Sequence, residues 1–396
     1  MAPPCVHRRV RSRAGARGTA SVSARDCPAG APHHTPGRRP PRFGAYPRTR
    51  SRTASGGTVS SAVVDVLARA ARAAAHPVAA PAARDCRGCA HGPEVLADRP
   101  DGIVVRHGPA VAKAHDPATD PAAHRSRLAL AADPRLTGIL LPPLPLPAGA
   151  GEIPGRPVSV WPHGSPVDPA DPGAAPWEAT AALLAALHTV PAPGPRSPTG
   201  APPVMRGPLK AARAIARMRR ESRHPAVRDV ERAWHRLPAW ARGETPAATP
   251  PGGPVGLCHG DLHLGQLVRH PAPTGPWLLI DIDDLGLGAQ AWDLARPAAW
   301  FAAGLLAPEV WQRFIGAYLT AGGPAADPAE PWAALDVPAR ALTVQSAALA
   351  LARAAREDRA PDETDTAVLD ACARIAALPT DAEPAPNSSS RAGASK

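Results

Sequence analysis

The sequence predicts an α+β fold with two lobes, a small antiparallel sheet followed by a mainly helical region. Short apolar stretches separated by turn residues fill residues 95–115, and helical periodicity prevails after residue 176. A strongly strand-like stretch, 277–280, interrupts the helices. With 396 residues, 44% of them hydrophobic, the chain is long enough to bury two such lobes. We expect the first lobe at 61–160 and the second at 161–378.

The net charge of +11 comes from the first sixty residues. Residues 1–60 hold twelve arginines and one acid, Asp26, whereas the rest of the chain has 33 basic and 33 acidic residues. This Arg- and Pro-rich segment offers little apolar surface to bury, so we predict a disordered tail there and a second one at 379–396. The balanced charge of the folded part disfavours nucleic-acid binding, although an RNA- or DNA-binding arm stays open as an alternative. A native start near Val59 is a further interpretation of the tail.

The cysteines and the hydropathy indicate a soluble, cytoplasmic protein with no membrane partner. No apolar run approaches the roughly 18 residues that are needed to cross a bilayer. The six cysteines are too few for a disulfide scaffold at this length. Cys86-Arg87-Gly88-Cys89, with His91 nearby, has a spacing used by zinc sites, but a structural site needs four ligands and no second pair lies within sequence reach. Ordinary reduced thiols are therefore the favoured interpretation.

Each element of the first lobe follows from a local pattern. Apolar residues on one face indicate a helix, turn residues divide the strands, and Asp120 followed by Pro121 is a typical helix start. The expected elements are a helix over 61–75, strands over 95–98, 103–107 and 110–115, a helix from 120 to about 132, and extended pieces over 137–141 and 157–161.

The second lobe is predicted from apolar residues that recur with the helical period. The predicted helices run over 177–188, 208–222, 226–241, 292–305, 308–320, 339–355 and 364–377. The Pro-rich stretches 191–203 and 244–254 are predicted loops.

Two polar segments flank the strand-like stretch of the second lobe. Residues 258–266 read CHGDLHLGQ, and residues 277–294 read WLLIDIDDLGLGAQAWDL. An acid, Asp261, is thus followed by an amide, Gln266, and by a second acid, Asp281, at the end of the apolar strand. Phosphoryl transfer needs such a set, because carboxylate and amide oxygens bind Mg²⁺ while another carboxylate orients the acceptor hydroxyl. The pattern therefore indicates a magnesium-dependent phosphoryl-transfer site.

These segments resemble the aminoglycoside phosphotransferase and choline kinase family, over roughly residues 90–375. The family pattern is His-Gly-Asp, four residues and Asn, followed by an apolar strand that ends in Asp. The resemblance implies a two-lobed protein-kinase-like fold that uses ATP and Mg²⁺. It also implies that Asp261 is the catalytic aspartate and that Asp281 binds magnesium. Residues that match supporting positions are His259, Asp284 and Asp293.

Two positions depart from the family pattern. Gln266 stands where most members have Asn, and its amide oxygen, one methylene further from the backbone, still suits Mg²⁺. The HLGQ form of this motif resembles the maltokinase branch of the same superfamily. Ala289-Gln290 replaces an Asp-Pro pair of many relatives, which leaves open how that loop is supported.

The first lobe offers a candidate nucleotide site. Lys113 ends the third strand, where the resemblance places the lysine that pairs with the ATP phosphates. It is one of only three lysines in a chain with 42 arginines, so a lysine at this position indicates a need for a compact ammonium. Trp161, near the crossover between the lobes, lines the adenine pocket or only packs the junction. The helix that follows Lys113 lacks the glutamate that should pair with it.

The sequence favours transfer of the ATP γ-phosphate to a hydroxyl of a small polar molecule. The acceptor is aminoglycoside-like or, in the manner of a maltokinase, a sugar. A nucleotide-binding pseudokinase that regulates a partner is the alternative from another class, and the missing helix glutamate motivates it. ATP and Mg²⁺ are the expected cofactors, whereas neither the acceptor nor the oligomeric state is predicted.

Overall fold

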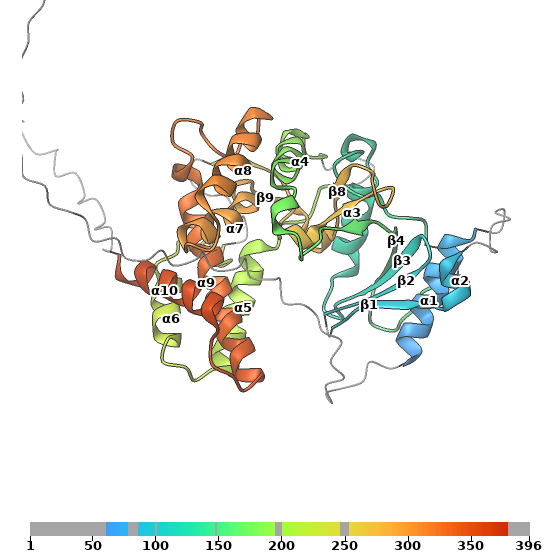
Figure 1. Ribbon diagram of the computed structural model, residues 1–396, viewed down its shortest axis with the longest axis horizontal. Coiled ribbons are helices and arrows are strands. Elements are labelled where there is room, and N and C mark those ends of the chain that lie inside the picture. The colour runs from blue at the N-terminus through green and yellow to red at the C-terminus, as the bar shows by residue number, and fades with distance from the viewer. Residues whose placement is uncertain are drawn as a thin grey trace, which may run out of the picture. The chain divides into compact units, whose positions relative to one another are not determined.

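The computed structural model describes residues 61–77, 86–99, 101–146, 149–194, 200–245 and 253–378 (Figure 1). These residues belong to one compact unit. The predicted tails at 1–60 and 379–396, and the start considered near Val59, lie outside the described residues.

A four-stranded antiparallel sheet contains the three predicted strands and the extended piece that was predicted at 157–161. Its order is β1-β2-β3-β4, so neighbours in sequence are neighbours in the sheet. In the β2–β3 hairpin, His107 pairs with Ala110 beside the turn, and Gly102 pairs with His115 at the open end. The strands are β1 (Glu94–Arg99), β2 (Gly102–His107), β3 (Ala110–His115) and β4 (Val158–Pro162).

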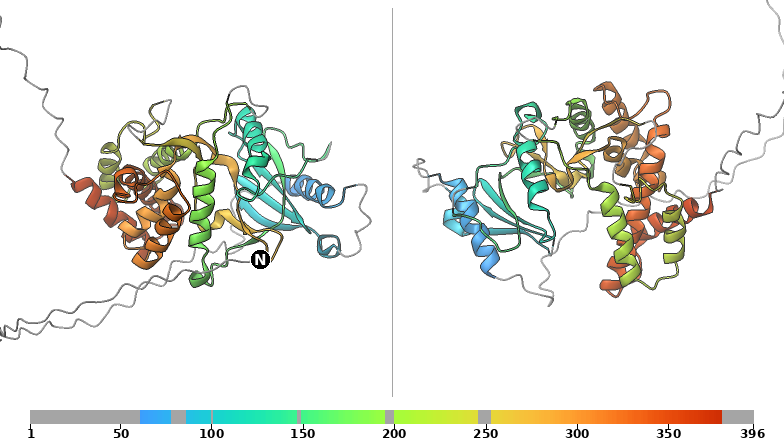
Figure 2. Two further views of the ribbon diagram at one scale, coloured as in Figure 1. Left: turned by 90° about the horizontal axis from the view of Figure 1, so that it is seen from above. Right: turned by 180° about the vertical axis from the view of Figure 1, so that it is seen from behind.

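Helix α1 (Ser61–Ala75) covers one face of this sheet, and its bounds agree with the prediction. The figures show α1 and the short helix α2 (Arg87–His91) beside the strands (Figures 1 and 2). The contact is apolar, because every second strand residue faces the helix and these residues are Ile, Val or Ala. Its buried residues are Leu67, Ala70, Ala71, Ile103, Val105, Ala112, Ala114 and Val160.

Helix α3 (Pro121–Ala131) begins where the sequence predicts, because the Asp120 carboxylate accepts hydrogen bonds from the backbone N–H of Ala122 and Ala123. The strand expected at 137–141 is wrong in extent. A 3₁₀ turn precedes this segment, and Leu140 makes only a single bridge to Leu279. Prolines 142 and 143 follow and have no N–H with which to continue a ladder.

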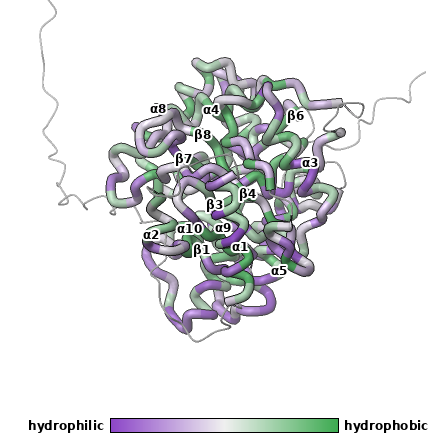
Figure 3. Tube along the Cα trace, turned by 90° about the vertical axis from the view of Figure 1, so that its right-hand side faces the viewer, coloured by the Kyte–Doolittle hydropathy of each residue, from purple (hydrophilic) through white to green (hydrophobic). Residues whose placement is uncertain are grey.

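The second half is mainly helical, as predicted. Figure 3 shows hydrophobic and hydrophilic stretches interleaved along the trace, as expected for helices that share a core. The helices described in the second half are α4 (Trp177–Thr189), α5 (Gly207–Glu221), α6 (Val227–His235), α7 (Ala291–Ala302), α8 (Pro308–Thr320), α9 (Trp332–Arg356) and α10 (Glu363–Ala377).

Three helix boundaries differ from the prediction. Helix α6 ends at His235, because Pro238 begins a separate turn. Helix α7 ends at Ala302, before a left-handed Gly304. Helix α9 begins at Trp332, seven residues before the predicted start at 339, and runs through Pro338. The packing of the buried first turns of α9 outweighs the backbone hydrogen bond that the proline removes.

Two small sheets hold the motif segments in place. Strand β6 (Val255–Cys258) pairs with β9 (Gly286–Ala289), and β7 (Leu267–Arg269) pairs with β8 (Trp277–Leu279). A short strand β5 (Ser165–Pro166) pairs with β7. None of the described helices is both long and apolar enough to span a membrane.

Candidate active site

The two motif segments form tight turns after β6 and β8, which belong to different sheets. The turn after β6 requires glycine at 260, because this residue has φ +86° and an added β-carbon would lie 2.5 Å from the Asp284 carbonyl oxygen. Asp281 follows β8 with φ +64°, in the left-handed region that residues other than glycine seldom adopt. Such a conformation at a polar residue is typical of functional sites, where the surrounding structure holds it.

The predicted supporting residue Asp293 holds the backbone of the turn that carries Asp261. Its carboxylate accepts hydrogen bonds from the N–H of His259 at 2.6 Å and of Gly260 at 2.7 Å. His188 contacts the same carboxylate through Nε2 at 3.1 Å, and both side chains are fully buried. Three hydrogen bonds thus satisfy a buried carboxylate and fix the turn.

His259 joins the two motif segments. Its Nε2 donates to the carbonyl oxygen of Ile280 at 2.8 Å, directly before Asp281. The ring is buried and bonded to backbone, which suits the structural role that the sequence favoured for this histidine.

Asp261 lies between two cations. Lys210 Nζ is 2.6 Å from Asp261 Oδ2, and a guanidinium nitrogen of Arg296 is 2.7 Å from Oδ1. Burial by itself would raise the pKa of Asp261, but the charges of Lys210 and Arg296 outweigh it and hold the pKa below its usual range. Asp261 is therefore ionised and oriented.

Asp281, Gln266 and Lys113 come together from distant parts of the chain. Lys113 Nζ donates to Asp281 Oδ1 at 2.8 Å across 168 residues of sequence. The Gln266 amide nitrogen is 3.4 Å from Asp281 Oδ2. Burial alone would lower the pKa of Lys113. The two aspartates beside it raise the pKa by a larger amount, so the net shift is upward.

The second of those aspartates, Asp283, was missed by the sequence analysis. Its Oδ2 is 2.9 Å from Lys113 Nζ, and its Oδ1 is 2.8 Å from Nδ1 of His115. Burial opposes ionisation, yet Lys113 and His115 hold the pKa of Asp283 well below its usual range. Lys113 thus pairs with Asp283 in place of the glutamate that the helix after Lys113 lacks.

Helix α3 faces this region with other side chains. The ring of His124 lies 4.2 Å from that of His115, and burial together with His115 lowers the pKa of His124 to about 4. The buried guanidinium of Arg127 donates to the carbonyl oxygens of Leu285, at 2.8 Å, and Val204, at 3.3 Å. The helix is therefore tied to the loop after Asp284 by an arginine rather than to Lys113 by a glutamate.

Lys210 was also missed, although a signal for it exists. Its Nζ bridges Asp261 and Asp284, 2.8 Å from the latter, and Arg206 lies 3.3 Å from the other Asp284 oxygen. The argument from the rarity of lysine that singled out Lys113 applies equally to Lys210. Four carboxylates and four basic side chains thus balance one another in this acidic cluster, which consists of Asp261, Asp281, Asp283 and Asp284 with Lys113, Lys210, Arg206 and Arg296.

Trp161 and Gln290 are the remaining positions that the sequence analysis singled out. The indole of Trp161 donates to Ser159 Oγ at 2.8 Å on β4, and its ring is partly exposed. Gln290, which replaces the proline of many relatives, donates to the carbonyl oxygen of His188 at 2.7 Å. The loop is therefore supported by an amide that reaches the neighbouring helix.

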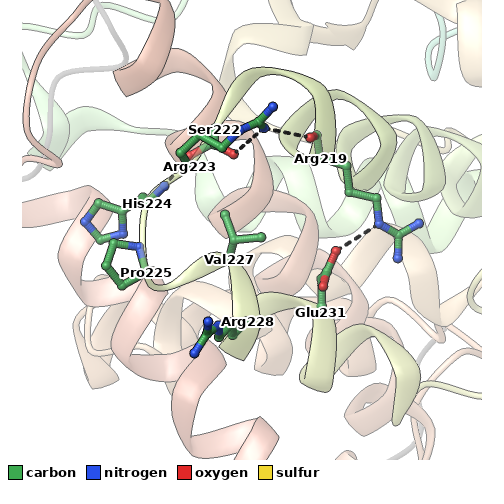
Figure 4. Close-up of a pocket in the computed structure, with 8 residues that line it drawn as sticks. All are labelled: Arg219, Ser222, Arg223, His224, Pro225, Val227, Arg228 and Glu231. Atoms are coloured by element: carbon green, nitrogen blue, oxygen red, sulfur yellow. Dashed lines mark hydrogen bonds and ion pairs between the residues drawn. The ribbon is translucent and has the colours of Figure 1, made fainter.

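A hollow of about 640 Å³ lies apart from these residues. It is formed by the end of α5 and the start of α6, and Figure 4 shows Arg219 paired with Glu231 along its rim. Its lining contains none of the acidic cluster, so it has no part in the site described above.

Comparisons with known proteins were made against families and solved structures. Residues 102–335 match the Phosphotransferase enzyme family. The chain is similar to a choline/ethanolamine kinase family protein from Mesorhizobium loti, with 18% identity and a TM-score of 0.48 over 78% of this chain and 94% of that one. It is also similar to a thermostable mutant of an aminoglycoside phosphotransferase, with 13% identity and a TM-score of 0.46 over 72% and 93% of the two chains. It is similar as well to an amicoumacin kinase in complex with AMP-PNP and Ca²⁺, with 16% identity and a TM-score of 0.48 over 72% of this chain and 87% of that one. No curated protein matches the sequence.

Proposed function

The chain belongs to the phosphotransferase enzyme family, and from that premise we propose that it transfers the γ-phosphate of ATP to a hydroxyl of a small polar molecule. The observation that carries the proposal is the meeting of Lys113 and Asp281 at 2.8 Å. Lys113 lies on β3 of the first sheet, and Asp281 lies two residues after β8 in the second half. Phosphoryl transfer requires a phosphate-binding cation beside a metal-binding carboxylate, and these two side chains supply both.

Asp281 and Gln266 are the residues that would hold Mg²⁺. Their carboxylate and amide oxygens suit a hard cation, and Asp281 is one-third exposed. The two side chains are in contact through the Gln266 amide nitrogen, so the amide would turn to offer its oxygen to the ion. Bound there, the ion would neutralise charge on the β- and γ-phosphates. The Lys113 ammonium, which contacts the two aspartates, would then also bind a phosphate oxygen of the nucleotide.

Asp261 is the residue that would orient the acceptor. In the proposed reaction a bond forms between the acceptor oxygen and the γ-phosphorus, the bond to the β,γ-bridging oxygen breaks, and ADP leaves. The hydroxyl proton passes to Asp261 late in this step, because Lys210 and Arg296 keep that carboxylate a weak base. Lys210, which bridges Asp261 and Asp284, is placed to stabilise charge on the transferred group.

The nature of the acceptor is not decided by charge. An acidic run at 357–365 lies near the end of the chain, where it could attract a cationic antibiotic. Arg359 pairs with Glu357 and Asp365, and Arg353 also pairs with Asp365, so part of this run is neutralised within the chain. Aminoglycosides, sugars including maltose, and amino alcohols therefore belong in the same test.

The test is ATP consumption by the full chain with Mg²⁺ across that panel. We expect turnover with at least one acceptor, and Asp261→Ala should lower kcat by about 10² to 10⁴-fold. Asp336→Asn, which changes an exposed carboxylate of α9 paired with Arg340, is the matched control and should leave kcat unchanged.

Two results would contradict the proposal. Full activity in Asp261→Ala would remove that carboxylate from the chemistry. Tight ATP binding with no turnover on any acceptor would favour the nucleotide-binding pseudokinase, and calorimetric titration with ATP separates this outcome from a protein that does not bind the nucleotide at all.

A further inference from the structure

A group of metal-ligating side chains lies outside the acidic cluster. Among the described residues, two sets of His, Cys and acidic side chains place their ligand atoms within 4.8 Å of one another. One set belongs to the surroundings of Lys113 described above. The other, which we call the Cys–His cluster, consists of His76, Cys86, Cys89 and His107.

Three separate elements build the Cys–His cluster. His76 directly follows the last turn of α1, Cys86 and Cys89 belong to the start of α2 and its cap, and His107 is the last residue of β2. The N–H of Cys89 donates to the Cys86 carbonyl oxygen at 3.0 Å. This turn brings both sulfurs of the Cys-x-x-C sequence to one side, as in structural zinc sites.

The distances fit one tetrahedral ion. Cys89 Sγ lies 3.4 Å from His76 Nε2 and 3.3 Å from His107 Nε2. Zinc binds thiolate at about 2.3 Å and imidazole at about 2.0 Å, so a tetrahedral site separates sulfur from nitrogen by about 3.5 Å. The two observed separations agree with the edges of such a tetrahedron.

Hydrogen bonds account for the Cys89 contacts in only one arrangement. The thiol proton can go to one of the two imidazole nitrogens at hydrogen-bond distance, and the other ring must then donate its own N–H to the sulfur. Cys86 is brought equally close to the hairpin, because an added β-carbon at Gly108 would lie 2.5 Å from its sulfur. A shared cation would satisfy all four ligand atoms at once.

We propose that His76, Cys86, Cys89 and His107 bind a structural zinc ion. Two thiolates and two imidazoles in a tetrahedral arrangement are typical of zinc, and the thiolates would neutralise the ion. The second ligand pair that the sequence analysis found missing comes from His76, 13 residues before Cys89, and His107, 18 residues after it. The proposal stands against the ordinary thiols that the sequence analysis favoured.

The consequence is a fixed corner of the first sheet. The ion joins the end of α1, the helix α2 and the turn of the β2–β3 hairpin, elements that otherwise meet through small apolar contacts. Cys89 is exposed, so the ion is open to strong chelators and to thiol reagents. The site is independent of the proposed phosphoryl transfer.

The first experiment measures metal in the full chain purified from zinc-containing medium without chelators. We expect about one zinc per chain by plasma mass spectrometry. Cys89→Ser should retain less than about a tenth of an equivalent. Cys372→Ala, which alters a buried thiol of α10, is the matched control and should keep the full equivalent.

The second experiment replaces zinc with cobalt in the native chain, so that it does not depend on a variant that folds. Tetrahedral thiolate coordination gives Co²⁺ intense visible bands and a sulfur-to-metal charge-transfer band. We expect both bands in the native chain and in Asp281→Asn, which alters the proposed magnesium site, and neither in Cys89→Ser. Retention in Asp281→Asn separates this site from the one on which the proposed function rests.

Three outcomes would overturn the proposal. They are a native chain that takes up neither zinc nor cobalt after loading under reducing conditions, equal zinc in the native chain and Cys89→Ser, and a stable Cys86–Cys89 disulfide that persists in reductant and excludes the metal. Loss of phosphoryl transfer with zinc intact would instead count against the proposed function alone.

Discussion

The two ends of the β2–β3 hairpin carry different chemistry. Beside the turn, His107 belongs to the Cys–His cluster, in which neutral imidazoles and cysteines that bind as thiolates would hold a metal. At the open end, about 17 Å away along the strands, Lys113 and His115 enter a cluster of four carboxylates. The acidic end is held by opposite charges that substrates can replace, whereas the turn end is built from ligands suited to one permanent ion. The two ends should therefore respond separately to mutation.

The largest expected effect is at the acidic end. Lys113→Met leaves Asp281 and Asp283 side by side without the cation between them, and removes the proposed phosphate partner. We expect kcat/KM for ATP to fall roughly 100-fold. Lys113→Arg should recover part of the loss, because it restores the charge but not the compact ammonium. Steady-state kinetics and zinc content are measured together, and loss of zinc in Lys113→Met would break the separation between the two ends.

The converse change tests the turn end. Cys89→Ser should leave kcat within a few-fold of the native value but lower the free energy of unfolding by about 3 kcal/mol in zinc-containing buffer, since a ligand at 100 times its Kd contributes about that much. Urea unfolding monitored by tryptophan fluorescence measures the difference. In the presence of a strong chelator the two curves should coincide, and a gap that survives chelation would contradict a metal-based origin.

The acidic end was largely predictable because its key residues are close in sequence. Asp261, Gln266 and Asp281 lie within 21 positions of one another, on either side of an apolar strand whose end fixes where the last acid falls. Lys113 was found from the rarity of lysine. Asp283 was missed because strand alternation ends at Asp281, and the 3₁₀ turn that aims Asp283 at Lys113 has no signal of its own. Lys210 was overlooked because a basic residue on an amphipathic helix is usually solvated.

The turn end was not predictable from local spacing. Its ligands are separated by a helix end, a connection outside the described residues and two strands, and only the pairing register of the sheet brings His107 to Cys89. The predicted start of α9 was wrong for a related reason, because packing and not local sequence decides it. Pro338 should end a helix by its backbone chemistry, but the burial of Leu335 and Pro338 in the core decides the outcome.

A smaller effect is expected from Asp283→Asn, with a pH dependence of known sign. The pKa of Asp283 is held well below its usual value in the folded state, so its ionisation stabilises the fold above the unfolded pKa near 4 and this contribution disappears as pH falls through the folded pKa. At pH 7 the variant should lose about 2 kcal/mol of unfolding free energy, and at an acidic pH below 4 this difference should be smaller. Urea titrations at both pH values decide it, and a constant difference would contradict the assigned role.

The smallest effect is expected from breaking an exposed ion pair away from both ends, which serves as the reference for the other variants. Arg313 on α8 pairs with Glu178 on α4, and both side chains are about half exposed. Solvent screens such a pair, and its formation immobilises two flexible side chains, so Arg313→Ala should change the free energy of unfolding by less than about 1 kcal/mol and leave kcat and zinc content unchanged. Urea unfolding in low and high salt measures this. A loss as large as that of Asp283→Asn would mean that ion pairs stabilise this protein regardless of burial, and the acidic end would then have no special electrostatic status.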